Sequence, residues 1–173
     1  MSVAHRPSVG PASRSLAPGA CRIARSAEDL ERHFAVRRTV FVDEQALFPG
    51  DDRDDRDDDP RTMNVVGTVA GVIGGAVRLY PLDDAGLWKG DRLAVLSELR
   101  HGLLGAELVR FAVRTAGGRG GARMTAMIQL PNVRFFEVLG WRASGAVEPF
   151  HAVDHQPMDI RLAPAGSVSR RAR

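Results

Sequence analysis

One segment of the sequence has residue types and spacing that could bind an anion. Residues 92–108 read RLAVLSELRHGLLGAEL, so a short apolar run leads through a basic, glycine-bearing turn into a helical pattern. The first amides of a helix have no partner within it and lie at the positive end of its dipole, so they can hold a pyrophosphate through the main chain. Arg100 and His101 would add positive charge there. Taken alone, the segment also fits an ordinary helix start.

The elements that would position this turn follow from the apolar periodicity. A first helix is predicted over about 27–40, where Ser26 and Asp29 have the spacing of a capping box. A second helix is predicted from 104 to the glycines that begin at 117, and a third over 133–139. Strands are predicted at six apolar runs: 64–69, 72–80, 91–96, 123–128, 141–147 and 158–162. This order indicates an α/β or α+β sheet with helices on its faces.

Composition and charge exclude several other classes of protein. The 24 basic and 21 acidic residues give a formal charge of +3, but much of the excess lies near the two ends, so no specific nucleic-acid partner is expected. The sequence has a single cysteine, Cys21, so neither an internal disulfide nor a cysteine-based zinc site is available. No apolar run is long enough for a membrane span or a secretory signal, and we expect a cytoplasmic protein without membrane contact.

Three regions are expected along the chain. Residues 1–19 have no periodicity and predict a disordered N-terminal tail, residues 20–163 predict one domain, and residues 164–173 predict a basic C-terminal tail. Within the domain, the acidic run 51–59 is interpreted as a solvated loop. Its charge could also attract a cationic acceptor at low ionic strength.

Two segments together resemble the GNAT superfamily of N-acetyltransferases. The coenzyme A motif of that superfamily consists of Arg or Gln, two residues of any type, Gly, one residue of any type, and then Gly or Ala. Arg100 and Gly105 match the ends of this motif, whereas Leu103 stands where its first glycine usually lies, with Gly102 one position earlier. Downstream, residues 135–141 read FFEVLGW and are similar to the superfamily's aromatic-Tyr-x-x-x-Gly-aromatic signature.

Upstream segments narrow the resemblance to a branch of the superfamily. Residues 37–45 read RRTVFVDEQ and look like the opening of the ElaA-like branch and of bacterial nitrogen-starvation-associated acetyltransferases. Residues 77–81, VRLYP, and 87–92, LWKGDR, are similar to the latter group. The resemblance covers about residues 20–162.

The resemblance implies a mixed, mostly antiparallel central sheet that splays in the middle, with helices on both faces. The pantetheine arm of acetyl-CoA, the implied co-substrate, would enter between parallel strands at 91–96 and 123–128. No metal is implied. The residues implied to bind coenzyme A are Leu93, Ala94 and Val95 along the arm, Arg100, His101, Gly102, Leu103, Leu104, Gly105 and Ala106 around the pyrophosphate, and Gln129, Asn132 and Phe136 further along the chain.

The implied reaction transfers an acetyl group to the amino group of a small acceptor. An alkyl amine with a pKa of about 10 is protonated at neutral pH, so a base must first remove a proton. Glu44 lies in a segment that forms one wall of the acceptor pocket in the resembled branch, and His155 stands where that branch has a histidine. Both are therefore catalytic candidates, and Glu44 is the first choice for the base. Phe136 occupies the place of a tyrosine that protonates the departing thiolate in many relatives, so a slower or differently assisted reaction is expected.

Two other functions stay open at this point. A regulatory module that binds coenzyme A without turnover is compatible with Leu103 and Phe136. An acyl transfer like that of acyl-homoserine-lactone synthases is suggested by the stretch VFVDEQ at 40–45. A homodimer is also compatible with the sequence.

Overall fold

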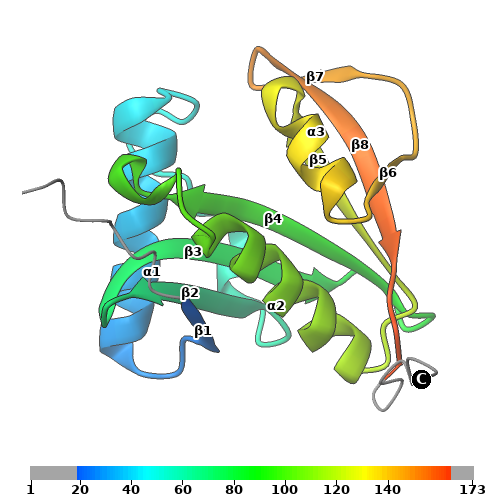
Figure 1. Cartoon of the computed structure of the whole chain (residues 1–173), viewed down its shortest axis with the longest axis horizontal. Coiled ribbons are helices and arrows are strands. Elements are labelled where there is room, and N and C mark those ends of the chain that lie inside the picture. Colours follow the sequence, from blue (N-terminus) through cyan, green and yellow to red (C-terminus); the bar gives the residue numbers. More distant parts are fainter. Residues whose placement is uncertain (1–18, 165–173) are drawn as a thin grey trace, which may run out of the picture.

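Eight strands form one open sheet within residues 19–164, which are the residues that the computed structural model describes (Figure 1). The strand order is β1-β2-β3-β4-β5-β8-β6, and β7 pairs with β8 off this path. The strands are β1 (Ala20–Ile23), β2 (Met63–Val69), β3 (Val72–Pro81), β4 (Leu87–Val95), β5 (Arg123–Gln129), β6 (Arg142–Ala143), β7 (Glu148–Phe150) and β8 (Val153–Arg161). Neighbouring strands are antiparallel except β4 and β5. The predicted mixed, mostly antiparallel sheet is therefore confirmed.

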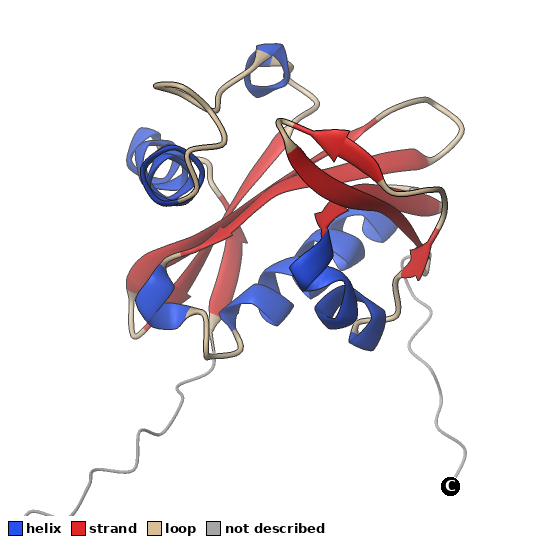
Figure 2. Ribbon diagram, turned by 90° about the horizontal axis from the view of Figure 1, so that it is seen from above, coloured by secondary structure: helices blue, strands red, loops and turns tan. Residues whose placement is uncertain are grey.

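Helices cover both faces of this sheet (Figure 2). On one face lies α1 (Ala27–Arg38), and on the other lie α2 (Leu104–Gly118) and α3 (Val133–Val138). Alternate residues of β3 serve the two faces, because side chains along a strand point to opposite sides. Val77 packs in the core beneath α2, whereas Ala76 packs in the core beneath α1.

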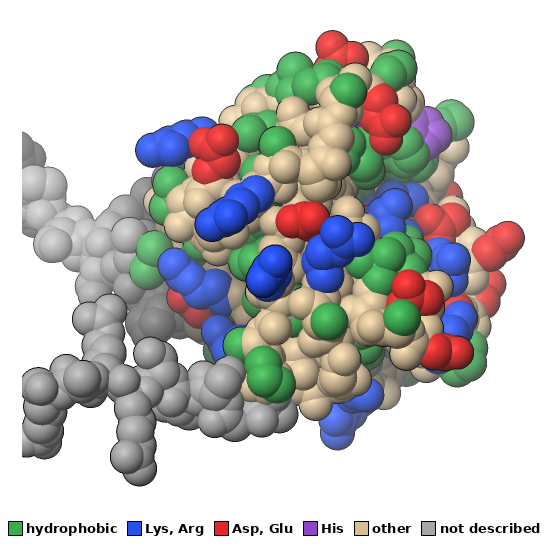
Figure 3. Space-filling view, turned by 90° about the vertical axis from the view of Figure 1, so that its right-hand side faces the viewer, with side chains coloured by type: hydrophobic (Ala, Val, Ile, Leu, Met, Phe, Trp, Pro, Cys, Tyr) green, Lys and Arg blue, Asp and Glu red, His purple; other side chains and the backbone are tan. Residues whose placement is uncertain are grey.

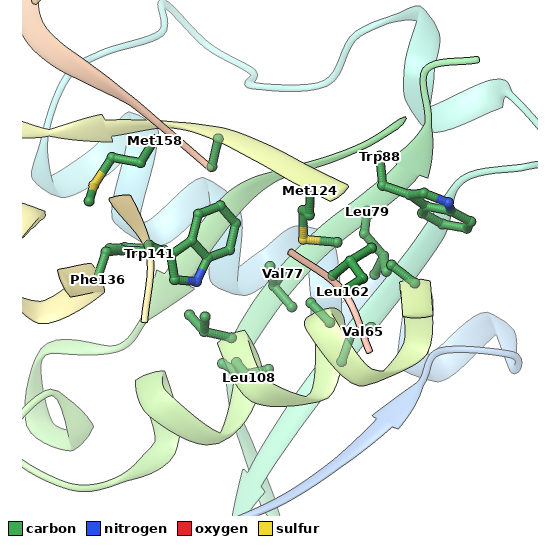
Figure 4. Close-up of a cluster of buried hydrophobic side chains, with 14 of the residues drawn as sticks. Val65, Val77, Leu79, Trp88, Leu108, Met124, Phe136, Trp141, Met158 and Leu162 are labelled. Atoms are coloured by element: carbon green, nitrogen blue, oxygen red, sulfur yellow. The ribbon is translucent and has the colours of Figure 1, made fainter. Parts of the chain in front are cut away.

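The larger core lies between the sheet and α2 (Figure 4). Leu104 and Leu108 of α2 are buried in it. The helix lies close to the strands because glycine occupies the facing position: a Cβ atom at Gly75 of β3 would lie 2.6 Å from Leu108 Cδ1. This close packing fixes the first turn of α2 beside the end of β4.

The sheet splits between β4 and β5. These two parallel strands pair only between Leu87–Lys89 and Arg123–Thr125, and beyond these residues they diverge (Figure 1). The divergence breaks the ladder in the middle of the sheet, so the predicted splay is confirmed. The split separates the two strands between which the sequence predicted it, those at 91–96 and 123–128.

A bulge in β4 lies on the edge of the split. The register of β3 against β4 shifts between Ala76 and Arg78, so Val77 lies opposite two residues of β4, Arg92 and Leu93. Arg92 has a φ of 53°, which is uncommon for a residue other than glycine. A bulge leaves an extra residue out of the ladder and re-aims the strand.

Most predicted elements are present, with shifted bounds. The first helix ends as α1 at Arg38 and continues as a π-helical turn, Thr39–Glu44. The hairpin of β2 and β3 is confirmed. The strand predicted at 141–147 is wrong beyond Ala143: the Ser144 amide donates to Pro157, but 145–147 have no strand partner and pairing resumes only in β7. The predicted tails, apart from Gly19 and Pro164, lie outside the described residues.

Charged side chains of both signs lie close together over much of the face shown in Figure 3. Ion pairs at the surface include Arg22 with Asp29 at 2.6 Å and Arg134 with Glu137 at 3.2 Å. Among residues 19–164, no helix is both long and apolar enough to span a membrane.

Candidate active site

A cavity of about 180 Å³ opens where β4 and β5 diverge. Its walls come from both of these strands, from α2, from the turn before α3, from the segment after α1 and from the β7–β8 hairpin. The residues of the predicted site that line it are Leu93, Gln129, Asn132, Phe136 and His155. The fold thus brings together side chains that are up to 62 positions apart in the sequence.

The turn before α2 leaves main-chain amides without a partner. The residue before the helix, Leu103, makes no side-chain capping bond. Within the described part of the chain, no amide from Leu103 to Ala106 donates a hydrogen bond, whereas the Gly102 amide donates to the Leu99 carbonyl at 3.1 Å. Leu104 is buried in the core and anchors the turn to the sheet, whereas Leu103 is 54% exposed and leaves the outer side of the turn open to solvent. This arrangement suits an anion at a helix N-terminus.

Arg100 holds this turn in place. Its Nε donates to the carbonyl of Val95 at 2.8 Å, and its guanidinium forms an ion pair with Glu44. Glu44 itself does not line the cavity, although its neighbour Gln45 does. The structure therefore places the Glu44 carboxylate beside the turn, where it is engaged with Arg100, and not beside the cavity. The remaining predicted residues of this region, Ala94, Val95, His101, Gly105 and Ala106, also lie outside the cavity lining.

His155 is the catalytic candidate that the fold brings to the cavity. Its side chain lines the cavity and is buried. The Nδ1 atom lies 2.7 Å from the carbonyl oxygen of Val153, so Nδ1–H donates there and Nε2 is left as the acceptor nitrogen. The pairing of β5 with β8 places His155 opposite Gln129, whose Nε2 donates to Gln45 Oε1 at 3.0 Å. An imidazole and two side-chain amides thus lie close together at this wall.

The α3 side of the cavity is aromatic. Phe136 is buried, and its ring meets the ring of Trp141 edge to face at 5.4 Å. The position at which many relatives carry a tyrosine therefore has no hydroxyl group here. Asn132 lies directly before α3 and also lines the cavity, so it adds a side-chain amide to this part of the lining.

The acidic run forms a buried ionic cluster with arginines, which the sequence reasoning missed. Arg37 of α1 pairs with Asp52 at 2.8 Å and with Asp57 at 2.7 Å, and no side chain of the three is more than 1% exposed. Arg78 of β3 pairs with Asp57 at 3.0 Å. The predicted solvated loop is therefore wrong for Asp52 and Asp57. A sequence signal existed: both arginines occupy apolar positions of their elements, and a buried charge needs a partner.

This cluster shifts the ionisation of its members. Burial alone would raise the pKa of Asp57, but hydrogen bonding and charge from Arg37 and Arg78 lower that pKa to about 2. His33 lies against Arg37, and its Nδ1 is 3.0 Å from the carbonyl oxygen of Val65. Burial and the positive charge of Arg37 lower the pKa of His33 to about 4. The ring is therefore uncharged at neutral pH.

Arg92 connects the ionic cluster to the cavity. Its guanidinium donates to the Asp52 carbonyl and to the Asp54 carboxylate, both at 3.1 Å, and lies over the ring of Phe48 at 4.7 Å from the centroid. Arg92 is also a cavity-lining residue and stands at the β4 bulge. The acidic segment thus holds the bulged edge of the cavity from the α1 face of the sheet.

The fold and the site together define the class of protein. A mostly antiparallel sheet that splays between two parallel strands and an open helix start beside the split are the features that the GNAT resemblance implied. The chain belongs to the acetyltransferase (GNAT) family, whose sequence profile matches residues 27–141.

Solved structures share this fold at low sequence identity. Escherichia coli ElaA superposes with a TM-score of 0.71 at 20% identity, over 82% of this chain and 97% of that one. An acyl-CoA N-acyltransferase from Pseudomonas aeruginosa gives a TM-score of 0.68 at 22% identity, over 82% and 98%. A CoA-dependent acyl-homoserine lactone synthase, BjaI, with SAM and isopentyl-CoA, gives 0.66 at 21% identity, over 79% and 77%. A comparison with curated proteins found no match. The ElaA-like branch stays a prediction.

Proposed function

We propose that this chain is an N-acyltransferase that moves the acyl group of a coenzyme A thioester, acetyl in the simplest case, directly to the amino group of a small acceptor. The observation that supports this proposal most is that unpartnered amides at the start of α2 lie beside the split between β4 and β5. Membership of the GNAT family supports the same chemistry. So does the BjaI structure, in which a related fold is found with isopentyl-CoA.

The residues present fit such a donor. The amides from Leu103 to Ala106 would hold the diphosphate, with Arg100 keeping the turn in shape through Val95. The arm would pass along β4 into the cavity, where Gln129 and Asn132 offer side-chain amides to its polar groups. We assign His101, Gly102, Leu104, Gly105 and Ala94 to the main-chain surface along this path.

His155 would act as the base in the transfer. Its Nε2 accepts a proton from the protonated acceptor amine, and the neutral nitrogen then bonds to the thioester carbonyl carbon. The carbon–sulfur bond breaks, and the thiolate leaves and takes the proton from His155. The nitrogen gives up its second proton to water, which leaves a neutral amide. A main-chain amide freed by the β4 bulge can stabilise charge on the thioester oxygen by about 3 kcal/mol. Because Phe136 offers no proton, departure relies on the thiol, which has an ordinary pKa of about 8.5.

Glu44 has a supporting place in this proposal. Its pair with Arg100 joins the π-helical turn after α1 to the turn before α2. Loss of this pair would loosen the turn that holds the diphosphate. Glu44 becomes the next candidate for the base if His155 proves dispensable.

The proposal is tested by binding and turnover on the purified chain. A thioester at about 100 times its dissociation constant should add roughly 2.7 kcal/mol to the free energy of unfolding, seen as a higher melting temperature. Thiol release from acetyl-CoA and longer acyl-CoAs is then followed across a panel of small amines. Stabilisation with amine-dependent thiol release supports the enzyme. Stabilisation without release from any thioester would instead indicate a coenzyme A-binding regulatory module, and no stabilisation by any of them would overturn the proposal.

A further inference from the structure

We propose that this site takes acyl groups longer than acetyl, in the range of about four to six carbons, and that the closed end of the cavity limits the length of the acyl chain. The inference rests on the proposed function, because it assigns the donor for the same site. Three observations carry it: the direction in which the donor must lie, the place where the cavity ends, and the chemistry of the residues there.

The donor must lie with its acyl end toward the closed end of the split. The open end is marked by the start of α2, where a Cβ atom at Gly105 would lie 3.8 Å from Val95 Cγ2. The closed end is marked by the residues just after α2, where a Cβ atom at Gly121 would lie 2.7 Å from Trp88 Cδ1. The helix therefore runs back along β4 from the diphosphate site toward the point at which β4 and β5 pair. A thioester that enters at Leu103 points its acyl group the same way.

The cavity continues past the position of the thioester. The bulge lies at Arg92, but the lining extends along β4 past Gly90 to Lys89 and along β5 to Met124. On α2 it includes Val109 and Ala112, which lie about 8 and 12 Å along the helix from its first residue. The chamber between the bulge and the paired strands thus lies beyond the reacting carbon, where the acyl chain would extend.

The α2 side of the inner chamber is apolar and is left open by small residues. The side chains there are hydrocarbon, thioether or indole: Val77, Val109, Ala112, Met124 and Trp141. The charged residues Lys89 and Asp91 also line the cavity, from the alternate positions of β4 that face the α1 side of the sheet. Figure 4 shows Val77, Met124 and Trp141 around the same part of the core. Gly90 contributes no side chain, and a Cβ atom there would lie 3.2 Å from Met124 Sδ.

The depth of the chamber exceeds the need of an acetyl group. Acetyl adds a single methyl group beyond the reacting carbon, whereas the lining continues for about 7 Å along β4 from the bulge at Arg92 to Gly90. Such a chamber favours a hydrocarbon chain, because each buried methylene contributes about 0.8 kcal/mol, or roughly fourfold in affinity.

The decisive experiment measures the affinities of a series of thioesters. Calorimetric titration of the purified chain with CoA, acetyl-CoA, butyryl-CoA, hexanoyl-CoA and decanoyl-CoA should show the dissociation constant falling at least tenfold from acetyl to butyryl or hexanoyl. It should rise again at decanoyl, which the chamber cannot hold. The ratio of the acetyl to the hexanoyl dissociation constant is the quantity compared between variants.

Variants on α2 locate the effect. Ala112→Leu fills the chamber and should bring that ratio close to one. Val109→Ala removes two carbons from the wall and should move the optimum toward longer chains. Val113→Leu is the matched control, because Val113 is partly buried on the same helix and does not line the cavity, and it should keep the wild-type ratio.

The outcomes separate the two proposals. Acetyl-CoA binding as tightly as the longer thioesters, or Ala112→Leu leaving the ratio unchanged, would overturn the inference while the transferase proposal stands. If Ala112→Leu does not fold, Val109→Ala decides, since an unchanged optimum in that variant has the same meaning. Failure of CoA and every thioester to bind would overturn the proposed function itself.

Discussion

The ring of His155 is held by a hydrogen bond within the β7–β8 hairpin, and this bond leaves Nε2 as the nitrogen that can accept a proton. The bond from Nδ1 to the Val153 carbonyl fixes the tautomer, and the strand pairing with Gln129 sets the ring at the cavity wall. A side chain held in this way needs little reorganisation to accept a proton. The opposite case is Glu44, whose carboxylate is engaged with Arg100 outside the cavity.

Replacement of His155 tests its role directly. His155→Gln keeps a hydrogen-bonding side chain but removes the base, so turnover with any accepted amine should fall by about 100-fold or more. Stabilisation by an acyl-CoA should persist, because the proposed diphosphate site lies on the turn before α2. The matched control is His151→Gln, an exposed histidine in the same hairpin that does not line the cavity. Full turnover in His155→Gln would move the role of base to another residue, with Glu44 examined next.

Among the elements, the loop from 51 to 59 has a larger structural role than its composition indicates. Its carboxylates neutralise two buried arginines, and its contacts with Arg92 reach the bulge of β4. The loop therefore couples α1, β3 and β4 on one face of the sheet. The cavity edge formed by Arg92 depends on this coupling.

The stability of the loop can be measured through Asp57. Asp57→Asn keeps the shape of the side chain but leaves Arg37 and Arg78 with one fewer buried counter-charge. Breaking such a pair should lower the free energy of unfolding by about 3 kcal/mol, measured by urea denaturation. Asp58→Asn is the control, because Asp58 is exposed and should change stability by less than about 0.5 kcal/mol. A loss below about 1 kcal/mol in Asp57→Asn would show that the cluster contributes little.

At the scale of the whole molecule, the split divides the sheet into two parts. One part contains β1 to β4 with α1, and the other contains β5 to β8 with α3. The ladder between them is short, Leu87–Lys89 against Arg123–Thr125, and α2 packs against strands of both. The cavity therefore lies where neighbouring strands of the sheet share the fewest backbone pairs, so a ligand can enter between them.

The pH dependence of global stability follows from His33. The pKa of His33 is about 4 in the folded chain and has its ordinary value of 6.5 in the unfolded chain, so the unfolded chain binds more protons between these two pH values. Stability should therefore fall as the pH is lowered from about 6.5 to about 4, by up to roughly 3 kcal/mol. Asp57, whose pKa is lowered, adds a further loss between about pH 4 and pH 2. Urea midpoints at pH 7.5, 6.0 and 5.0 measure the first effect, and His33→Gln should flatten it. A flat wild-type profile in this range would contradict the assignment.

Much of the fold and part of the site could be predicted from local patterns. Apolar periodicity located the hairpin of β2 and β3, the helix from Leu104 and the strand from Arg123, because each depends on residues near in sequence. The turn before α2 was recognisable for the same reason. The irregular segment after Ala143 was missed, since its lack of a strand partner depends on where β7 returns to β8.

The sequence by itself determined the alternation of helices and strands and the glycine-bearing turn before α2, because these follow from short-range spacing and capping. It indicated the class of the protein through the resemblance of two segments to GNAT motifs. Only the tertiary structure decided which catalytic candidate lines the cavity, which aspartates are buried and how far the cavity extends beyond the bulge. Those features depend on residues that are distant in the chain: Arg78 with Asp57, His155 with Gln129, and Met124 with Val109. Contacts of this kind are set by packing across the sheet, which no local pattern encodes.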